Sequence, residues 1–247
     1  MRKQRKAAGP TDIVIQDWPD LCQQVFRFRK SGHWIFRGVK DVDVELKPKI
    51  GRDGARRSVS TGDPLPYDRS KEELMVDYFI RSAPPHIKHT PKSRLEWLTI
   101  AQHHGMATRL LDWTESLLVA AYFAIENWDG GTPTICAVKN VPIAPKKDHE
   151  RLDKLGDVTL YFPPHISPNI AAQRSVFTVH KFPDQRYRPI GLERLILKRH
   201  GTGTAPITYR LNLDACGINR ASLFPDINGL AETVSWLYKW DRLPPAL

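Results

Sequence analysis

Apolar residues at helical spacing mark the first element that the sequence predicts. Leu21, Val25 and Phe28 recur at intervals of three and four residues, so residues 17–30 are expected to form a helix. Residues 33–39 are mostly aromatic or β-branched, and they predict a strand that ends at an Arg-Gly pair. The glycine, arginine, serine and proline residues that follow indicate a long exposed loop before the next helix.

Residues 102–123 form the most informative stretch, because a polar segment lies there between two apolar ones. Gly105 is expected to end the first helix, since glycine adopts the left-handed turn at little steric cost. The polar turn TRLLDW follows, and Thr114 is placed to cap a second helix. That helix reads LLVAAYFAI and carries no charge, so we expect it to be buried and to hold the polar turn in place. Its predicted core residues are Leu117, Ala120, Ala121 and Ala124.

The second half of the chain predicts mainly strands. Strand patterns occur at residues 132–139, 176–180, 193–198 and 207–213, and an amphipathic helix runs through Trp240. Helices early and strands late predict the α+β class, with a single domain in which helices pack on a mixed sheet. The domain is expected to span residues 12–247, after a disordered basic tail at residues 1–11.

The charge of the chain favours acidic partners. It has 37 Lys and Arg against 27 Asp and Glu, a net charge of +10, which suits nucleic acid but also fits an ordinary basic protein. The three cysteines are far apart and show no metal or disulfide spacing, so reduced thiols in a cytoplasmic protein are expected and no metal is. No apolar run of about 20 residues occurs, and a membrane partner is therefore not expected.

Arginines at the ends of predicted elements are the first candidates for binding chemistry. Arg37 precedes Gly38, and a planar guanidinium beside a glycine can hold a phosphate or carboxylate that comes close to the main chain. The alternative is a structural arginine that pairs with Asp112. Arg109 lies three residues before Asp112 and could pair with it, or could itself face a ligand.

Amides and imidazoles supply the other candidates. Gln102 and His103 could donate hydrogen bonds to a nucleotide, whereas the neighbouring His104 points elsewhere and cannot share a metal with His103. Gln173, just before a strand, could bond a ribose or a base edge but cannot act as a base. The sequence contains no GxxxxGK, GxGxxG after a strand, HExxH or GxSxG motif.

These residues lie in segments that resemble the FRG domain family. The Phe-Arg-Gly motif is present at residues 36–38, and similar segments follow at 45–52, 102–124, 169–180 and 221–230. The resemblance thus runs from about residue 12 to 235, with departures at Ala107, Asn169 and Ser175. It implies a role in prokaryotic or phage conflict systems, as an antiviral defence protein or toxin-type effector with a partner protein of such a system.

The order of the polar segments also resembles that of ADP-ribosyltransferases. Those enzymes have Arg or His before Gly on an early strand, a Ser/Thr-bearing strand before a helix, and a late Glu or Gln. The resemblance implies that a nucleotide such as NAD is the cofactor. It assigns catalytic roles to Arg37, Thr108 and Gln173 and ligand-binding roles to Gly38, Gln102, His103, Gly105, Arg109 and Thr114.

Two functions therefore remain open from the sequence. In one, a pocket formed by Arg37, Gln102, Thr108 and Arg109 binds a nucleotide, and the protein catalyses a glycosyl transfer to nucleic acid or protein. In the other, the domain is a non-catalytic module that binds nucleic acid or a partner protein of a defence system.

Overall fold

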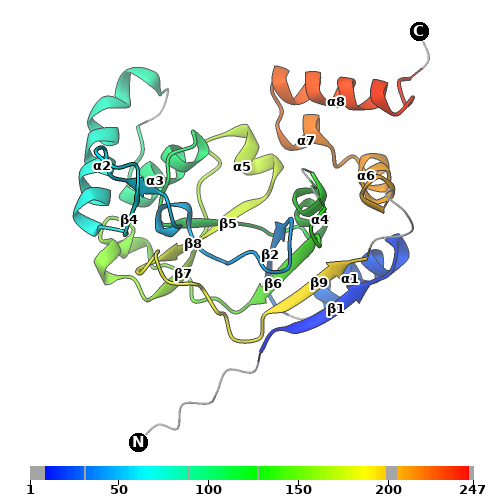
Figure 1. Ribbon diagram of the computed structural model, residues 1–247, viewed down its shortest axis with the longest axis horizontal. Coiled ribbons are helices and arrows are strands. Elements are labelled where there is room, and N and C mark those ends of the chain that lie inside the picture. The colour runs from blue at the N-terminus through cyan, green and yellow to red at the C-terminus, as the bar shows by residue number, and fades with distance from the viewer. Residues whose placement is uncertain are drawn as a thin grey trace, which may run out of the picture.

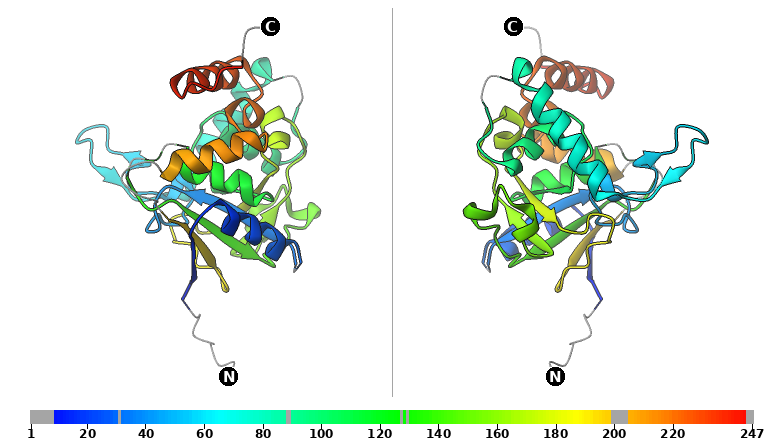
Figure 2. Two further views of the ribbon diagram at one scale, coloured as in Figure 1. Left: turned by 90° about the vertical axis from the view of Figure 1, so that its right-hand side faces the viewer. Right: turned by 90° about the vertical axis from the view of Figure 1, so that its left-hand side faces the viewer.

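The computed structural model describes residues 9–30, 32–87, 90–126, 128, 130–198 and 205–244. Within these residues the fold is α+β, as predicted, with one mixed sheet in the order β1-β9-β6-β2-β5-β8-β7 (Figure 1). Its strands are β1 (Thr11–Ile15), β2 (Trp34–Val39), β5 (Leu110–Thr114), β6 (Thr134–Lys139), β7 (Val158–Tyr161), β8 (Ser175–His180) and β9 (Glu193–Leu197). The short strands β3 (Arg56–Arg57) and β4 (Pro64–Leu65) form a separate hairpin, which projects from the molecule in Figure 2.

Eight α-helices are present in the described part of the chain. They are α1 (Trp18–Arg29), α2 (Arg69–Ser82), α3 (Arg94–His103), α4 (Leu117–Ile125), α5 (Pro168–Ala172), α6 (Ala205–Ala215), α7 (Arg220–Leu223) and α8 (Ile227–Lys239). Among the named strands of the described residues, β1 and β9 pair in parallel and all other pairs are antiparallel. Because β1 starts at Thr11, the sheet begins one residue before the predicted domain boundary, and residues 1–8 of the predicted tail lie outside the described residues.

The sheet is divided at its centre. β2 pairs with β6 over six residues and β5 pairs with β8 over five, but β2 and β5 pair only between Phe36 and Thr114. The two halves, β1-β9-β6-β2 and β5-β8-β7, therefore diverge on either side of a single residue pair. Backbone groups of β2 and β5 beyond that pair need other partners, because unpaired buried peptide groups are costly.

Helices cover one face of the sheet and coil segments cover the other. Side chains alternate along each strand, so Phe36 faces a core shared with α1, α4 and α6, whereas Ile35 faces a second core. Leu46 and the ring of Tyr187 close that second core from two coil segments. A third core, which includes Leu98, lies between the β5-β8-β7 half and helices α2 and α3.

Some elements differ from the sequence prediction. Most of TRLLDW lies in strand β5 rather than in a polar turn, because Leu111 and Trp113 are both buried on one face and need an extended chain to lie there. Residues 207–213 lie in helix α6 rather than a strand, since Tyr209 and Leu213 are spaced by four and pack together into the core beside α4. Strands β1 and β7 were not predicted.

The predicted core of α4 is confirmed. Leu117, Ala120, Ala121 and Ala124 are all at most 5% exposed. The helix starts from Ser116, whose hydroxyl accepts a hydrogen bond from the amide of Val119, so Thr114 is not the cap that the sequence predicted. Thr114 instead accepts a hydrogen bond from the amide of Ser116.

Replacing Ala120 with leucine should overpack the contact between α4 and β2. An added side chain has no space there, because a Cβ placed on Gly38 would already lie 2.1 Å from the carbonyl oxygen of Ala120. We expect Ala120→Leu to lower the free energy of unfolding by about 1–3 kcal/mol, measured by urea denaturation. An unchanged midpoint would show that this helix face can move away from the sheet.

Candidate functional site

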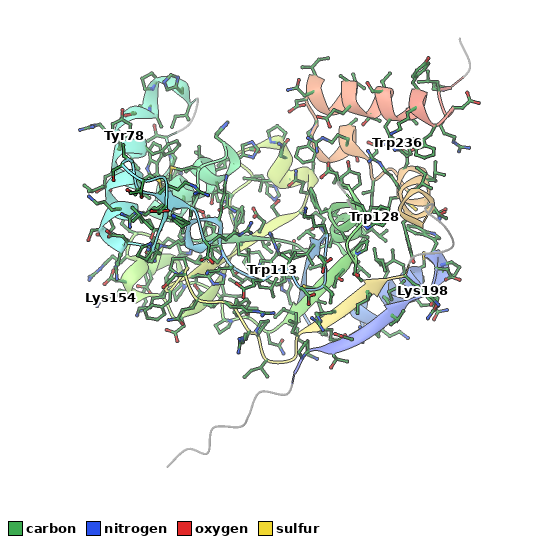
Figure 3. All side chains as sticks on the ribbon, viewed as in Figure 1. Tyr78, Trp113, Trp128, Lys154, Lys198 and Trp236 are labelled. Atoms are coloured by element: carbon green, nitrogen blue, oxygen red, sulfur yellow. The ribbon has the colours of Figure 1, made fainter. Side chains whose placement is uncertain are left out.

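A cleft of about 310 Å³ opens where the two halves of the sheet diverge. Its walls come from β2, β5, α4 and the segment before β8. The lining residues are Phe36, Arg37, Gly38, Asp112, Trp113, Thr114, Phe123, Gln173 and Ser175. Segments that are more than 130 residues apart in the sequence thus meet in one place, which we call the central cleft. Trp113, near the middle of the sheet, marks its position in Figure 3.

Arg37 bridges the gap between β2 and β5. Its Nη1 donates a hydrogen bond of 2.7 Å to the main-chain carbonyl oxygen of Asp112 and lies 3.5 Å from the carboxylate oxygen Oδ2. The guanidinium therefore replaces a missing backbone hydrogen bond of the sheet. Its side chain is 19% exposed, so part of the guanidinium stays accessible from the cleft.

The carboxylate of Asp112 is held by Gln102 of α3, which is itself held by Thr108 in the segment between α3 and β5. Its Oδ1 accepts a 2.7 Å hydrogen bond from the amide nitrogen of Gln102. The amide oxygen of Gln102 in turn accepts a hydrogen bond from the hydroxyl of Thr108, which is fully buried and also accepts from the amide of Leu110. Gln102 therefore acts on the cleft by orienting Asp112.

Thr108 does not reach the central cleft. It is 0% exposed and its hydroxyl is engaged on both sides, which gives it a structural role, and its catalytic role stays a prediction. The segment at residues 45–52 reinforces this corner, because the amide of Ile50 donates to the carbonyl oxygen of Thr108 and Lys49 donates to that of Gly105.

Arg52 brings a second positive charge toward Arg37. The pKa of Arg52 is lowered, first by partial burial and then by repulsion from Arg37, while Asp112 opposes this shift. Its Nε donates to the carbonyl oxygen of Lys47, which holds the side chain in position. With two arginines and one carboxylate, this region has a net positive charge.

The glycine of the Phe-Arg-Gly motif serves packing. A Cβ on Gly38 would meet the main chain of α4 at Ala120 and Ala124, so the absent side chain admits a helix. The expectation that Gly38 leaves room for a ligand on that side is wrong. Its main chain still lines the central cleft.

Gln173 and Thr114 lie in the central cleft and contact each other. The hydroxyl of Thr114 donates a 2.7 Å hydrogen bond to the main-chain oxygen of Gln173, which ties β5 to the end of α5. The side-chain amide nitrogen of Gln173 donates to the carbonyl oxygen of Leu223. Its ligand-binding or catalytic role stays a prediction, but its place beside Arg37 fits the predicted arrangement.

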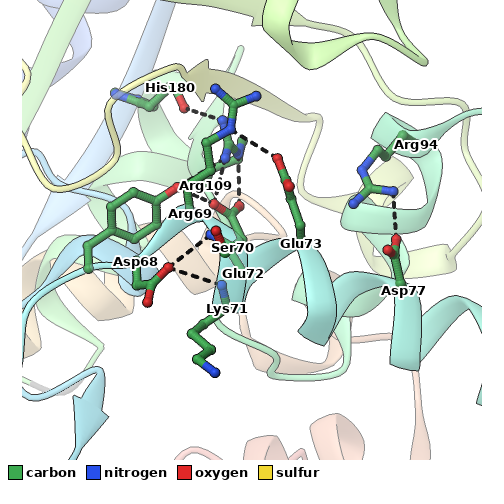
Figure 4. A network of polar contacts seen from close by, with 11 residues as sticks. Asp68, Arg69, Ser70, Lys71, Glu72, Glu73, Asp77, Arg94, Arg109 and His180 are labelled. Atoms are coloured by element: carbon green, nitrogen blue, oxygen red, sulfur yellow. Dashed lines mark hydrogen bonds and ion pairs between the residues drawn. The ribbon is translucent and has the colours of Figure 1, made fainter.

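Arg109 lies in a different part of the molecule. It forms a buried ion pair with Glu72 of α2, with Nε–Oε1 and Nη2–Oε2 distances of 2.8 and 2.5 Å (Figure 4). Further hydrogen bonds join it to the hydroxyl of Tyr67 and the carbonyl oxygen of His180. The expectation that Arg109 shares a cleft with Arg37 and Gln102 is therefore wrong, because this pair lines a separate cavity between α2, α3 and the segment near residue 150.

The extended conformation of the chain at the start of β5 explains why Arg109 and Asp112 do not pair. Three residues apart on a helix, the two would share a side, but on an extended chain they point to opposite faces. Glu72, which the sequence did not indicate, takes the place of Asp112 as the partner. It follows the helix cap Asp68, whose carboxylate accepts hydrogen bonds from the amides of Ser70 and Lys71.

His103 and Gly105 lie at the end of α3, outside the central cleft. Gly105 has φ +90° and ends the helix as predicted. His103 faces a smaller cavity, where its Nε2 lies 3.3 Å from the hydroxyl of Ser167, and burial lowers its pKa. The ring of His104 packs edge to face against it. A ligand in the central cleft would not touch these residues.

Strand β8 ends at a buried histidine, His180, which contacts other buried polar side chains. The indole nitrogen of Trp113 donates to the hydroxyl of Thr178, and Nε2 of His180 forms a 2.8 Å hydrogen bond with the same hydroxyl. Burial, followed by repulsion from Arg109 and Arg37, lowers the pKa of His180 to about 4.

The stability of the protein should therefore fall in mild acid because of His180. The unfolded state binds a proton below the ordinary pKa of 6.5, whereas the folded state stays neutral down to a pKa of about 4. This contribution is fully present above about pH 6.5, is lost as the pH falls toward about 4, and amounts to roughly 3 kcal/mol. Denaturant unfolding of the wild type and His180→Gln across this window should show a smaller acid loss for the variant, and parallel curves would contradict it.

No group of three or more His, Cys, Asp or Glu side chains in the described part of the chain is arranged to hold a metal ion. No helix among the residues with assigned structure is long and apolar enough to cross a membrane.

Asp112 is the functional candidate that sequence reasoning undervalued. The sequence predicts it as a partner of an arginine, either as a clamp or to orient Arg37 or Arg109 towards a ligand, yet its own carboxylate is 59% exposed in the central cleft and oriented from two sides. The available signal was its alternation with Leu111 and Trp113, which places it on the opposite face of a strand.

Comparison with known protein families gives one match. Residues 32–131 match the FRG domain, which confirms the resemblance noted from the sequence. The matched range contains β2, β5 and α4 and supplies Arg37, Asp112 and Thr114 to the central cleft, whereas Gln173 lies beyond it. No curated protein and no solved structure is significantly similar to the chain.

Proposed function

We propose that this chain, which carries an FRG domain, binds a nucleotide such as NAD in the central cleft and transfers its glycosyl group in the manner of an ADP-ribosyltransferase. One observation carries the proposal. Arg37, Thr114 and Gln173, which come from three distant segments in the order typical of such enzymes, line the same cleft at the split in the sheet. Order in sequence alone is a weak argument for function, and convergence in space strengthens it.

The cleft offers two kinds of contact to a nucleotide. Arg37, partly exposed at its rim, can bind a diphosphate oxygen through the guanidinium nitrogens that do not hold the main chain of Asp112. Phe123 provides an apolar wall for a planar ring, and its own ring is fixed by an edge contact with Phe224. A volume of about 310 Å³ suits part of a dinucleotide, so the rest of the ligand would extend toward solvent.

Asp112 supplies the charge that the reaction needs. In glycosyl transfer the bond between the ribose and nicotinamide breaks, nicotinamide leaves with the electron pair, and positive charge develops on the sugar. A carboxylate fixed by Gln102 and Arg37 stabilises that charge without reorganising. As the acceptor oxygen or nitrogen bonds to the sugar, Asp112 accepts the proton that it releases.

The biological setting follows from the family resemblance. An antiviral or toxin-type effector of a prokaryotic conflict system would use such a transferase to modify nucleic acid or protein, together with a partner protein of that system. Growth arrest on expression of the wild type, and normal growth with Asp112→Asn, is the expected result in cells.

Nicotinamide release tests the enzyme proposal. Purified protein is incubated with NAD, with and without nucleic acid, and the products are separated by chromatography. We expect release with the wild type, loss with Asp112→Asn, and no change with Asp77→Asn, an exposed aspartate in the cavity near Arg94. If calorimetry also detects no NAD binding at concentrations of about 1 mM, the nucleotide proposal is wrong.

A basic groove favours the second function, binding of nucleic acid without catalysis. On the coil-covered face, Arg186, Arg188 and Arg194 line a cavity of about 340 Å³ with the ring of Tyr187. Arg194 is held by two 2.7 Å hydrogen bonds to Asp12, while Arg188 is exposed. Binding of RNA or single-stranded DNA that weakens steeply with salt, and with Arg188→Glu, would support this function over the enzyme.

A further inference from the structure

Helix α8 packs on the rest of the molecule through one side only. Gly229 lies against the end of α7, where a Cβ would meet the carbonyl oxygen of Phe224 at 2.0 Å, and the hydroxyl of Thr233 accepts from the amide of Ala221. Trp236, labelled in Figure 3, lies next to Arg210 of α6, 4.8 Å from its guanidinium carbon. This packed side fixes which residues face outward.

The outward side of α8 is apolar. Ile227, Leu230, Val234 and Tyr238 are 75%, 50%, 45% and 76% exposed. At about 100° per residue they fall within an arc of roughly 80°, turned well away from Gly229 and Thr233. We call these four residues the α8 stripe. Figures 1 and 2 show α8 at the edge of the molecule.

We propose that the α8 stripe binds the α8 stripe of a second copy of this chain, with the two helices antiparallel, so that the protein is a dimer. Contiguous apolar surface of this kind marks an interaction site in a soluble protein. The spacing of Ile227, Leu230, Val234 and Leu237 is that of a short heptad seam, in which apolar residues of two helices interdigitate. The inference does not depend on the function of the central cleft.

The distribution of charge favours a second copy that packs antiparallel on the α8 stripe. The chain carries a net charge of +10, so two copies repel unless they meet on a face without basic residues. The α8 stripe has no charge, and the nearby Glu232 is occupied by an ion pair with Arg220. Antiparallel packing also brings the acidic cap Asp226 toward the end that carries Lys239, whereas parallel packing would join like ends.

The proposed dimer contact includes residues that follow α8. Trp240 and Leu243 follow α8 and are 43% and 47% exposed. Stable dimers bury about 800 Å² on each partner, more than a short stripe supplies, so these two side chains are expected to pack beside the partner helix. A symmetric contact uses the same patch twice, so one exposed stripe is sufficient for both partners.

Sedimentation and light scattering of the full chain test the proposal. We expect a reversible dimer at concentrations of about 10–100 μM, and Leu230→Glu should raise its dissociation constant at least about tenfold. Tyr238→Glu repeats the test at the most exposed position, where folding is least affected. Asn228→Glu, exposed but outside the stripe, is the matched control and should leave the dimer unchanged.

The orientation has its own test. In a Cys216→Ser background, Ala231→Cys lies near the two-fold axis of an antiparallel pair and should form a disulfide-linked dimer, whereas Ile227→Cys should not. The opposite result would establish parallel packing. A wild-type chain that stays monomeric, or a dimer that survives both glutamate variants, would overturn the proposal, the first by assigning the stripe to a different partner and the second by locating the dimer contact elsewhere.

Discussion

Replacing Glu72 with alanine should destabilise the protein by about 3–5 kcal/mol. The carboxylate is 3% exposed and forms the only ion pair of Arg109 in the described part of the chain, where that arginine is 5% exposed. Removing it leaves a buried positive charge whose remaining hydrogen-bond partners are neutral oxygen atoms, those of Tyr67 and His180. Chemical denaturation with circular dichroism measures the loss, and a chain that fails to fold on expression would be its extreme form.

Two further variants separate the cost of leaving the buried charge of Arg109 unpaired from the cost of lost packing. Glu73→Ala removes the neighbouring carboxylate, which is 52% exposed and paired with Arg69, and should change stability by less than about 1 kcal/mol. The double variant Glu72→Leu with Arg109→Met replaces both charges by apolar groups and should recover much of the loss. If the double variant is as unstable as Glu72→Ala, the charge is not the reason.

The sequence predicted those parts of the fold that depend on local pattern. The apolar run of α4 and the aromatic strand β2 were predicted because each has a strong period or composition of its own. Strand β1 was not predicted because only Ile15 is buried there, and the residues of its partner β9 lie more than 180 positions away in the sequence. Its position depends on a long-range pairing that no local pattern encodes.

The candidate site was predicted in part for the same reason. Arg37 and Gln173 were identified because each stands at the end of an apolar element, where functional residues collect. Arg109 was misplaced because its environment is decided by Glu72, a residue 37 positions earlier on an otherwise ordinary polar helix. Asp112 was undervalued because its exposure follows from the division of the sheet, which only the register of β2 against β5 reveals.

Arg37 is the residue on which the nucleotide proposal depends most. Its stability role is modest, because the Asp112 carboxylate is 59% exposed and still bound by Gln102 when the arginine is absent. Arg37→Ala should therefore cost only about 1 kcal/mol of stability, the value of one hydrogen bond to the main chain. In contrast, loss of a charged contact to a phosphate should weaken NAD binding by at least about 2 kcal/mol, or roughly thirtyfold.

Lysine at this position gives the sharper result. It keeps the charge but cannot donate to the carbonyl oxygen of Asp112 and to a ligand through one planar group. We expect Arg37→Lys to fold with a normal midpoint and to lose most NAD binding, measured by calorimetry, and most nicotinamide release. Arg69→Lys, at an exposed arginine of the other cavity, serves as the control and should bind normally. Full binding by Arg37→Lys would mean that NAD binding requires only a positive charge at position 37. The planar guanidinium would then serve the structure alone, by bridging β2 and β5.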